Sequence, residues 1–158
     1  MSRLPALGPR GEGWVVLQGV LLLAVAAAGV QGPAWTGLAR TVTSVIGIGC
    51  IAFGLVLAVR GVRDLGSALT PLPHPLPGTD LVVTGVYGLV RHPIYGGLVC
   101  AAIGWGLLTA SPAALLAAIV LWGFFELKSR REEIWLGSQF AGYAAYKART
   151  RRLIPWIG

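Results

Sequence analysis

Polar and aromatic residues gather in the segment 85–97, which reads G-V-Y-G-L-V-R-H-P-I-Y-G-G and leads into an apolar run. Pro93 is typical of the first turn of a helix, so Arg91 and His92 are expected directly before a helix begins. A helix N-terminus attracts carboxylate or phosphate groups, and glycines let a backbone or a flat ligand come close. The residue types therefore indicate a site for a ligand with an anionic end.

The same segment has a plainer interpretation. Tyr87 and Tyr95 fit an aromatic belt at a membrane interface, and Arg91 could extend its side chain toward lipid headgroups. This interpretation gives no role to His92 or to the paired glycines, so both interpretations stay open.

A second polar group follows a later apolar run, in the sequence E-L-K-S-R-R-E-E. Lys128 and Glu132 are four residues apart and share one face of a helix, while Glu133 shares a face with Ser129. An ion pair at this spacing on a solvated helix contributes only about 0.2–0.5 kcal/mol, which is the plainer interpretation. Carboxylates that emerge at a membrane boundary can instead face a polar cavity and bind a cationic ligand.

The composition indicates which elements must position these residues. Of 158 residues, 55% are hydrophobic and only 12% are charged, whereas about a quarter are charged in soluble domains. Four apolar runs, at about 14–30, 42–59, 94–110 and 113–127, approach the ~17–25 residues that a helix needs to cross the hydrocarbon core. The sequence predicts an all-α, polytopic membrane bundle of about four transmembrane helices, folded as one domain over residues 1–158.

Only the residues T-A-S-P separate the last two runs, so these helices are expected to form a tight hairpin that Ser111 caps and Pro112 continues. The far ends of the two helices must then lie close together. The polar groups on those ends are expected to face each other: Arg91, His92 and Tyr95 on one side, Lys128, Glu132 and Glu133 on the other.

The loop charges predict an orientation. With four spans, both termini and the loop between the second and third spans lie on one side of the membrane. That side holds twelve of the thirteen Lys and Arg residues, namely Arg3, Arg10, Arg60, Arg63, Arg91, Lys128, Arg130, Arg131, Lys147, Arg149, Arg151 and Arg152. Only Arg40 is on the other side, so both termini are predicted to be cytoplasmic, in an inner or plasma membrane. Three spans with a re-entrant last pair are the alternative.

Three segments allow more than one interpretation. The first apolar run, preceded by Arg3 and Arg10, could be a cleaved signal peptide, although it is longer than a usual signal core. The segment 70–78, T-P-L-P-H-P-L-P-G, excludes a helix and is either a stiff connector or a wall over a site that presents His74. The tail 143–158 mixes aromatic and basic residues, which is typical of a surface that contacts lipid headgroups.

Other function classes are disfavoured. The net charge is +7, but the basic residues are not interleaved with aromatics on a soluble face, so no nucleic-acid partner is expected. Cys50 and Cys100 lie inside apolar runs, and His74 and His92 lack a second ligand at metal spacing. Neither a disulfide framework nor a metal site is therefore expected. Glycines in the second run allow close contact between helices and hence a homodimer.

The polar groups, taken in order, resemble the isoprenylcysteine carboxyl methyltransferase family. The resemblance covers roughly Thr79 to Pro155 and rests on the 85–97 segment, S-P at the hairpin, F-F-E-L-K-S-R-R-E-E-I-W-L, F-A-G-Y-A-A-Y-K and L-I-P. The sequence is similar, more loosely, to the phospholipid N-methyltransferases. The resemblance implies a helical membrane enzyme, without a Rossmann domain, that transfers a methyl group from S-adenosyl-L-methionine. Its acceptor would be a small lipophilic carboxylate, thiol or amine, which includes a prenylcysteine-like carboxylate.

The resemblance also implies a site, within a cytoplasmic cofactor-binding cap formed by residues 70–97 and 128–158. The positions that match the family's cofactor residues are Thr79, Asp80, Leu81, Val82, Tyr87, His92, Pro93, Ile94, Tyr95 and Glu132. Glu133 is a further candidate, because carboxylates and aromatic faces attract a sulfonium. Lys128 stands where the family has an arginine that contacts the acceptor, and lysine keeps the charge but lacks the bidentate fork. Lys128, Glu132 and Arg91 form the expected catalytic set.

Two other functions are compatible with the sequence. Membrane sterol reductases share a similar C-terminal pattern of tyrosine and histidine, and there the tail arginines would bind the phosphates of NADPH. A membrane module without catalytic activity is the third hypothesis.

Overall fold

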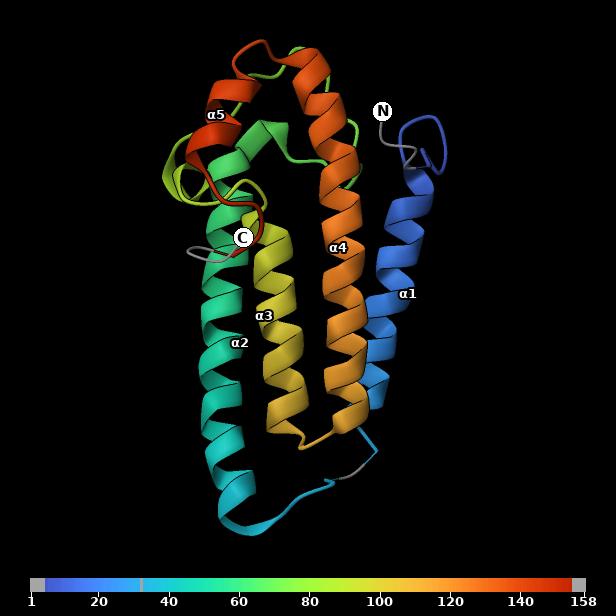
Figure 1. Ribbon diagram of the computed structural model, residues 1–158, viewed down its shortest axis with the longest axis vertical. Helices are drawn as coiled ribbons and strands as arrows, with labels where there is room; N and C mark the ends of the chain where they lie inside the picture. The colour runs from blue at the N-terminus through green and yellow to red at the C-terminus, as the bar shows by residue number, and fades with distance from the viewer. Residues whose placement is uncertain (1–4, 32, 155–158) are drawn as a thin grey trace.

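The computed structural model describes residues 5–31 and 33–154, which form a bundle of helices with a cap of shorter segments at one end (Figure 1). The helical elements in the described part are α1 (Glu12–Ala28), α2 (Gly37–Leu65), the 3-10 turns η1 (Gly66–Ala68) and η2 (Gly85–Gly88), α3 (Pro93–Leu108), α4 (Pro112–Gln139) and α5 (Tyr143–Arg149). These residues include no β-strand, only one isolated parallel bridge between Val90 and Arg151. The all-α class is confirmed. Arg3 of the charge pattern and Pro155 of the motif set lie outside the described residues.

The helices on both sides of the hairpin begin where the sequence supplies start signals. Pro93 and Pro112 occupy the first turns of α3 and α4, where an N–H group would have no helical partner. The Ser111 hydroxyl accepts a hydrogen bond from the Ala114 N–H at 3.2 Å and donates one to the Ala28 carbonyl at 2.8 Å. Ser111 therefore caps α4, as predicted, and also ties the hairpin to the end of α1.

Each apolar run coincides with a helix, but two helices extend beyond their runs. α1 and α3 match the predicted 14–30 and 94–110 to within about two residues at each end. α2 extends past 42–59 at both ends, and α4 continues from 113–127 through its polar residues to Gln139. Helical hydrogen bonding propagates along the backbone whatever the side-chain polarity, so hydropathy alone marks too short a helix.

The surface of the bundle suits a lipid environment. The stretches Gly37–Ala68 and Pro112–Gln139 are long and apolar enough to cross a membrane, with mean hydropathies of 2.5 and 1.4, and α1 and α3 are shorter apolar helices. Large hydrophobic side chains remain exposed along the bundle, among them Leu23 at 72% and Leu116 at 64%. Apolar surface of this extent is typical of membrane contact. The number of spans stays a prediction.

Glycines set the contact between α2 and α3. α3 packs against α2 on one side and α4 on the other, while α1 packs mainly against α4. A Cβ atom added to Gly47 would lie 2.6 Å from the Gly104 carbonyl oxygen, and one added to Gly104 would lie 2.6 Å from the Gly47 carbonyl oxygen. Gly54 and Gly97 approach each other in the same way. Gly47 and Gly54 of the predicted second span are therefore used for close packing within this chain.

The core lies where α3, α4 and α1 meet. Val99, Leu121 and Phe125 are fully buried there, and the Trp14 ring of α1 lies 5.6 Å from the Phe124 ring. At one end of the bundle, the segment 66–92, α5 and the tail cover the helix tips (Figure 1). The loop between α1 and α2 and the hairpin between α3 and α4 lie at the other end. Packing of the helices in this core thus places the start of α3 and the polar part of α4 beneath the same cap.

We predict that Gly54→Ala lowers the melting temperature of the detergent-solubilised protein. The new methyl group would meet the Gly97 carbonyl oxygen and the Ala101 backbone nitrogen, so the helices must separate. Overpacking of this kind costs about 1–3 kcal/mol.

Gly49→Ala on the same helix is the matched control, because a Cβ atom there meets nothing within 4 Å. Its melting temperature should stay the same or rise, since alanine favours helix by about 1 kcal/mol over glycine. Equal melting temperatures for the two variants would contradict the α2–α3 contact described above.

Candidate functional site

A cavity of about 310 Å³ lies under the cap, between the ends of α3 and α4. The predicted site residues that line it are Thr79, Asp80, Leu81, Val82, Tyr87, Arg91, His92, Ile94, Tyr95, Lys128 and Glu132. Pro93 and Glu133 belong to the predicted set but not to the lining. No group of three or more His, Cys, Asp or Glu residues that could hold a metal ion occurs in the described part of the chain.

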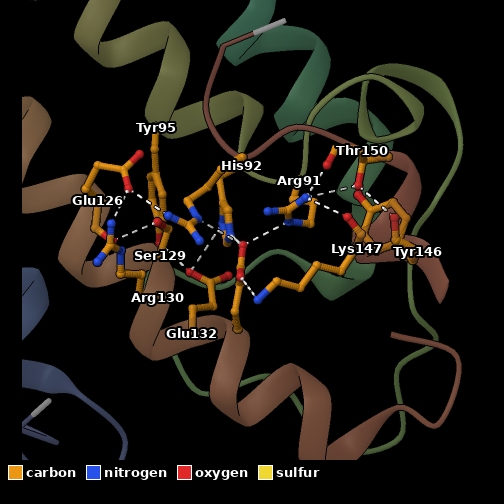
Figure 2. Close-up of polar contacts among 12 residues, drawn as sticks. Arg91, His92, Tyr95, Glu126, Ser129, Arg130, Glu132, Tyr146, Lys147 and Thr150 are labelled. Carbon is orange, nitrogen blue, oxygen red and sulfur yellow. Dashed lines mark hydrogen bonds and ion pairs between the residues drawn. The ribbon is translucent and has the colours of Figure 1, made fainter. Parts of the chain in front are cut away.

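Tyr95 and Glu132 meet in the wall of this cavity. The Tyr95 hydroxyl donates a hydrogen bond to Glu132 Oε2 at 2.8 Å (Figure 2). The His92 ring stacks on the Tyr95 ring with centroids 5.4 Å apart and an interplanar angle of 4°. The Tyr95 ring in turn stacks on Phe125 at 4.7 Å, and Phe125 is fully buried. The hydroxyl that orients the Glu132 carboxylate is therefore held by a column of packed rings.

The Glu132 carboxylate lies in the cavity wall, within electrostatic reach of Lys128 but not in direct contact with it. Its carboxylate accepts the bond from Tyr95, and the His92 Nδ1 atom lies 3.8 Å from its Oε2 atom. Among the described residues, Glu132 forms no ion pair with Arg or Lys. A cationic ligand in the cavity would therefore find an available carboxylate beside an aromatic face.

Glu133 lies behind the wall and holds the cap together. Its side chain is only 3% exposed and forms ion pairs with Arg91 Nε at 2.9 Å, Lys147 Nζ at 2.8 Å and Arg152 Nε at 3.3 Å. The His92 Nε2 atom lies 3.5 Å from the same carboxylate. These partners come from the start of α3, from α5 and from the tail, so this carboxylate joins three segments to α4.

Arg91 lines the cavity, but most of its guanidinium is engaged in structure. Its Nε atom binds Glu133, and one terminal nitrogen donates to the Lys147 carbonyl at 3.1 Å and to the Thr150 carbonyl (Figure 2). The Arg91 and His92 backbone N–H groups donate to the Arg151 and Arg152 carbonyls at 2.8 and 2.9 Å. The tail therefore fixes the backbone at the start of α3, and Arg91 has little left to offer a ligand.

His92 has a polar atom with no hydrogen bond. The residue is 5% exposed, and its buried Nε2 atom has no hydrogen-bond partner among the described residues. An unpaired buried polar atom is unfavourable. This atom faces the Glu133 carboxylate behind the wall, at 3.5 Å, whereas the Nδ1 atom lies on the side of Glu132 and of the cavity.

Lys128 places a buried ammonium group one helical turn before Glu132. The residue is 1% exposed, and its Nζ atom lies 5.0 Å from the centroid of the Tyr95 ring. The ammonium donates hydrogen bonds to Gln18 Oε1 at 2.5 Å and to the Pro71 carbonyl at 3.3 Å. The cavity therefore contains one fixed cation and one fixed anion on the same helix, one turn apart.

The proline-rich segment forms one wall of the cavity. Pro71, Pro73 and Pro75 line it, which favours the wall interpretation over a plain connector. His74 is not in the lining and packs against Trp135 with ring centroids 5.4 Å apart. This contact differs from the expectation that His74 is presented to a ligand. The alternating prolines themselves contribute to the wall instead.

Tyr143 and Tyr146 of the tail are buried rather than spread on a lipid surface, and Trp156 lies outside the described residues. Tyr143 and Tyr146 are 3% and 4% exposed and line the cavity. The Tyr146 hydroxyl donates to the Tyr87 carbonyl at 2.8 Å. Burial raises the pKa of Tyr146 to about 12, and burial together with the Glu132 charge raises the pKa of Tyr87 above its usual value. Both phenols therefore stay protonated and cannot act as bases at neutral pH.

Sequence reasoning did not include several lining residues. Val62, Leu65 and Phe140 are apolar and carry no local signal of a site. Gln18 had such a signal, because it is the one uncharged polar side chain in α1, and polar residues inside apolar helices tend to be functional.

Comparison with known proteins identifies the family of this chain. A sequence model of the phospholipid methyltransferase family matches residues 42–142. The protein-S-isoprenylcysteine O-methyltransferase of Saccharomyces cerevisiae is 35% identical over 124 residues, covering 76% of this chain and 52% of the yeast protein. Protein-S-isoprenylcysteine O-methyltransferase B of Arabidopsis thaliana is 35% identical over 70% of this chain and 58% of its own. A probable enzyme of the same name from Oryza sativa subsp. indica is 31% identical, covering 72% of this chain and 62% of its own.

The chain spans about half to three-fifths of the length of these curated relatives. The matched region runs from the second apolar helix to the start of α5, and it contains the start of α3 and all of α4. Because the match covers well over half of the chain, the protein belongs to the phospholipid methyltransferase family.

Proposed function

We propose that the protein is an integral-membrane methyltransferase that transfers a methyl group from S-adenosyl-L-methionine to a small lipophilic acceptor. The observation that carries this proposal is the Tyr95–Glu132 pair, which offers an aromatic face and a carboxylate without a direct Lys or Arg partner among the described residues, inside a cavity under the cap. Membership of the family supports the reaction class.

The residues present fit the proposed cofactor. When bound, S-adenosyl-L-methionine supplies an activated methyl group on a positively charged sulfur. Glu132 and the rings of Tyr87 and Tyr95 would attract this charge. His92, which lines the cavity on its Nδ1 side, and residues 79–82 would hold its polar ends. Glu133 would act indirectly, by fixing Arg91 and His92.

The protein's own contribution would be positioning and exclusion of water. Methyl transfer needs the nucleophile, the carbon and the sulfur in line, so a rigid wall matters more than a proton relay. The ring column of His92, Tyr95 and Phe125 supplies this rigidity, and the proline-rich segment covers the cavity. A dry cavity also strengthens each electrostatic contact.

The acceptor would be a small lipophilic carboxylate, thiol or amine. Val62 and Leu65 of α2, Ile94 of α3 and Leu136 of α4 give the cavity apolar walls, so the greasy part of an acceptor could lie among helix tips close to the bilayer. A prenylcysteine-like carboxylate belongs to this class, and the names of the relatives support it.

We also propose that residues 1–158 form one membrane domain with four spans and both termini in the cytoplasm. The location of both interhelical turns at one end of the bundle, with the cap at the other, supports this orientation (Figure 1). Under it, the water-soluble methyl donor would reach the site from the cytoplasm.

We predict that S-adenosylhomocysteine raises the melting temperature of the purified protein in detergent, because a ligand that binds only the folded state stabilises it. At a concentration 100 times its Kd, the gain is about 2.7 kcal/mol. NADPH, tested as the ligand of a sterol-reductase type of enzyme, should give no shift. A shift with NADPH alone would overturn the proposal, and no shift with either ligand would favour a module without catalytic activity.

We predict that substitution of Glu132 affects ligand binding, whereas substitution of the adjacent Glu133 affects the stability of the fold. Glu132→Ala and, likewise, His92→Ala should abolish S-adenosylhomocysteine binding, because each loses a group that faces the cavity. Glu133→Gln should instead destabilise the fold by about 3–5 kcal/mol, because it leaves the buried Arg91 charge unpaired.

Isothermal titration and thermal unfolding of the same preparations check both effects. Retained affinity in Glu132→Ala and His92→Ala would mean that the ligand site lies elsewhere. A Glu133→Gln variant as stable as the wild type would contradict the structural role given to Glu133.

A further inference from the structure

The carboxylate of Asp64 binds the backbone of a segment that is distant in sequence. Asp64 lies in the last turn of α2, and its Oδ2 atom accepts a hydrogen bond from the Val86 N–H at 2.8 Å. Val86 belongs to the 3-10 turn η2, and the side chain of Thr84, which precedes this turn, does not cap it. The first N–H groups of a helical turn have no partner within the turn. A carboxylate from α2 therefore supplies the cap that the local sequence lacks.

Gly85 allows the carboxylate to come this close. Its φ angle is +59°, in the left-handed region that favours glycine. A Cβ atom at this position would overlap with the Asp64 Oδ2 atom and would lie 2.6 Å from its Cγ atom. A side chain at residue 85 would therefore displace the carboxylate from the Val86 N–H group.

The capped turn carries Tyr87, one of the two aromatic rings to which the proposed function gives the sulfonium. Tyr87 is 7% exposed and lines the cavity, whereas Asp64 is exposed and does not line it. η2 packs against α2, and on its other side the Tyr146 hydroxyl donates to the Tyr87 carbonyl at 2.8 Å. Asp64 can thus act on the cavity only through the turn that presents Tyr87.

The orientation of Tyr87 depends on this turn more than the orientation of Tyr95 depends on its own backbone. The Tyr95 ring is stacked between the rings of His92 and Phe125. Tyr87 has no such contact with another ring in the part of the chain that the structure describes. The conformation of η2 therefore decides where the Tyr87 ring lies, and the Asp64 carboxylate fixes the start of η2.

We propose that Asp64 is a positioning residue, which holds η2 on α2 so that the Tyr87 ring faces the positive charge of the methyl donor. This inference rests on the proposed function. Asp64 touches neither the donor nor the acceptor. Its loss should therefore weaken recognition of the charged centre of the donor more than recognition of the rest of that molecule.

The test compares two ligands that differ at this centre. Sinefungin carries a positively charged amine near the position of the sulfonium, whereas S-adenosylhomocysteine has a neutral thioether there. In isothermal titration, Asp64→Ala should lower the affinity for sinefungin by about fivefold and leave that for S-adenosylhomocysteine within about twofold, because only the charged ligand needs the aromatic face. Asp64→Asn keeps an oxygen that can accept the Val86 N–H, so it should restore both affinities.

Hydrogen exchange without ligand measures the turn directly. Asp64→Ala should speed the exchange of the amides in residues 84–90, because the Val86 N–H loses its acceptor. Glu12→Ala is the matched control, since the exposed Glu12 carboxylate accepts the Arg10 N–H at 3.1 Å and lies outside the cavity lining. This variant should change neither ligand affinity nor the exchange of residues 84–90.

The outcomes separate this inference from the proposed function. Wild-type exchange of residues 84–90 in Asp64→Ala would overturn the positioning role, and so would faster exchange with both affinities unchanged. Equal losses for the two ligands would give Asp64 a general structural role and would also overturn it. If wild-type protein binds neither ligand, the proposed function fails, and the exchange of residues 84–90 alone then decides whether Asp64 holds the turn.

Discussion

The buried ion pair between Arg91 and Glu133 is the interaction on which the rest of the site depends. Arg91 precedes α3, Glu133 lies in the polar part of α4, and the remaining donors of Arg91 reach the Lys147 and Thr150 carbonyls of α5 and the tail. Because both charges are buried, neither can be lost without leaving the other unpaired at a high cost. The pair therefore forces the start of α3, the end of α4 and the tail into one arrangement, and the cavity is the space that this arrangement encloses.

The polar continuation of α4 gives adjacent residues different environments. Successive residues on a helix point about 100° apart, so Glu132 faces the cavity while Glu133 faces the tail. Lys128 lies one turn before Glu132 and shares its face. The two charges do not pair, since Tyr95 binds Glu132 and Gln18 binds Lys128. Tyr95 and Gln18 are uncharged, so neither forms an ion pair with the α4 side chain that it binds in the cavity.

Close packing of the bundle is what makes this site rigid. The glycines of α2 and α3 bring the two helices into backbone contact, and Phe125 in the core supports the ring of Tyr95. The methyl-transfer chemistry that we propose depends on alignment more than on acid–base groups, so rigidity is its main structural requirement. Tyr87 and Tyr146, whose raised pKa values keep them protonated, contribute shape and hydrogen bonds to the wall rather than proton transfer.

Local signals in the sequence predict the helices, the hairpin and the approach of Tyr95 to Glu132, because apolar runs, Ser111, Pro112 and helical spacing leave few alternative structures. The resemblance to the methyltransferase family also indicated residues 79–82 and Lys128, which line the cavity. The folded chain alone shows that Glu133 binds the tail, that His74 packs on Trp135, that Tyr143 and Tyr146 are buried, and that Gln18 meets Lys128. These contacts join segments far apart in sequence, and side-chain type alone does not say which of several possible partners a buried charge or ring will find. That choice depends on how the helices pack, which is a property of the whole chain.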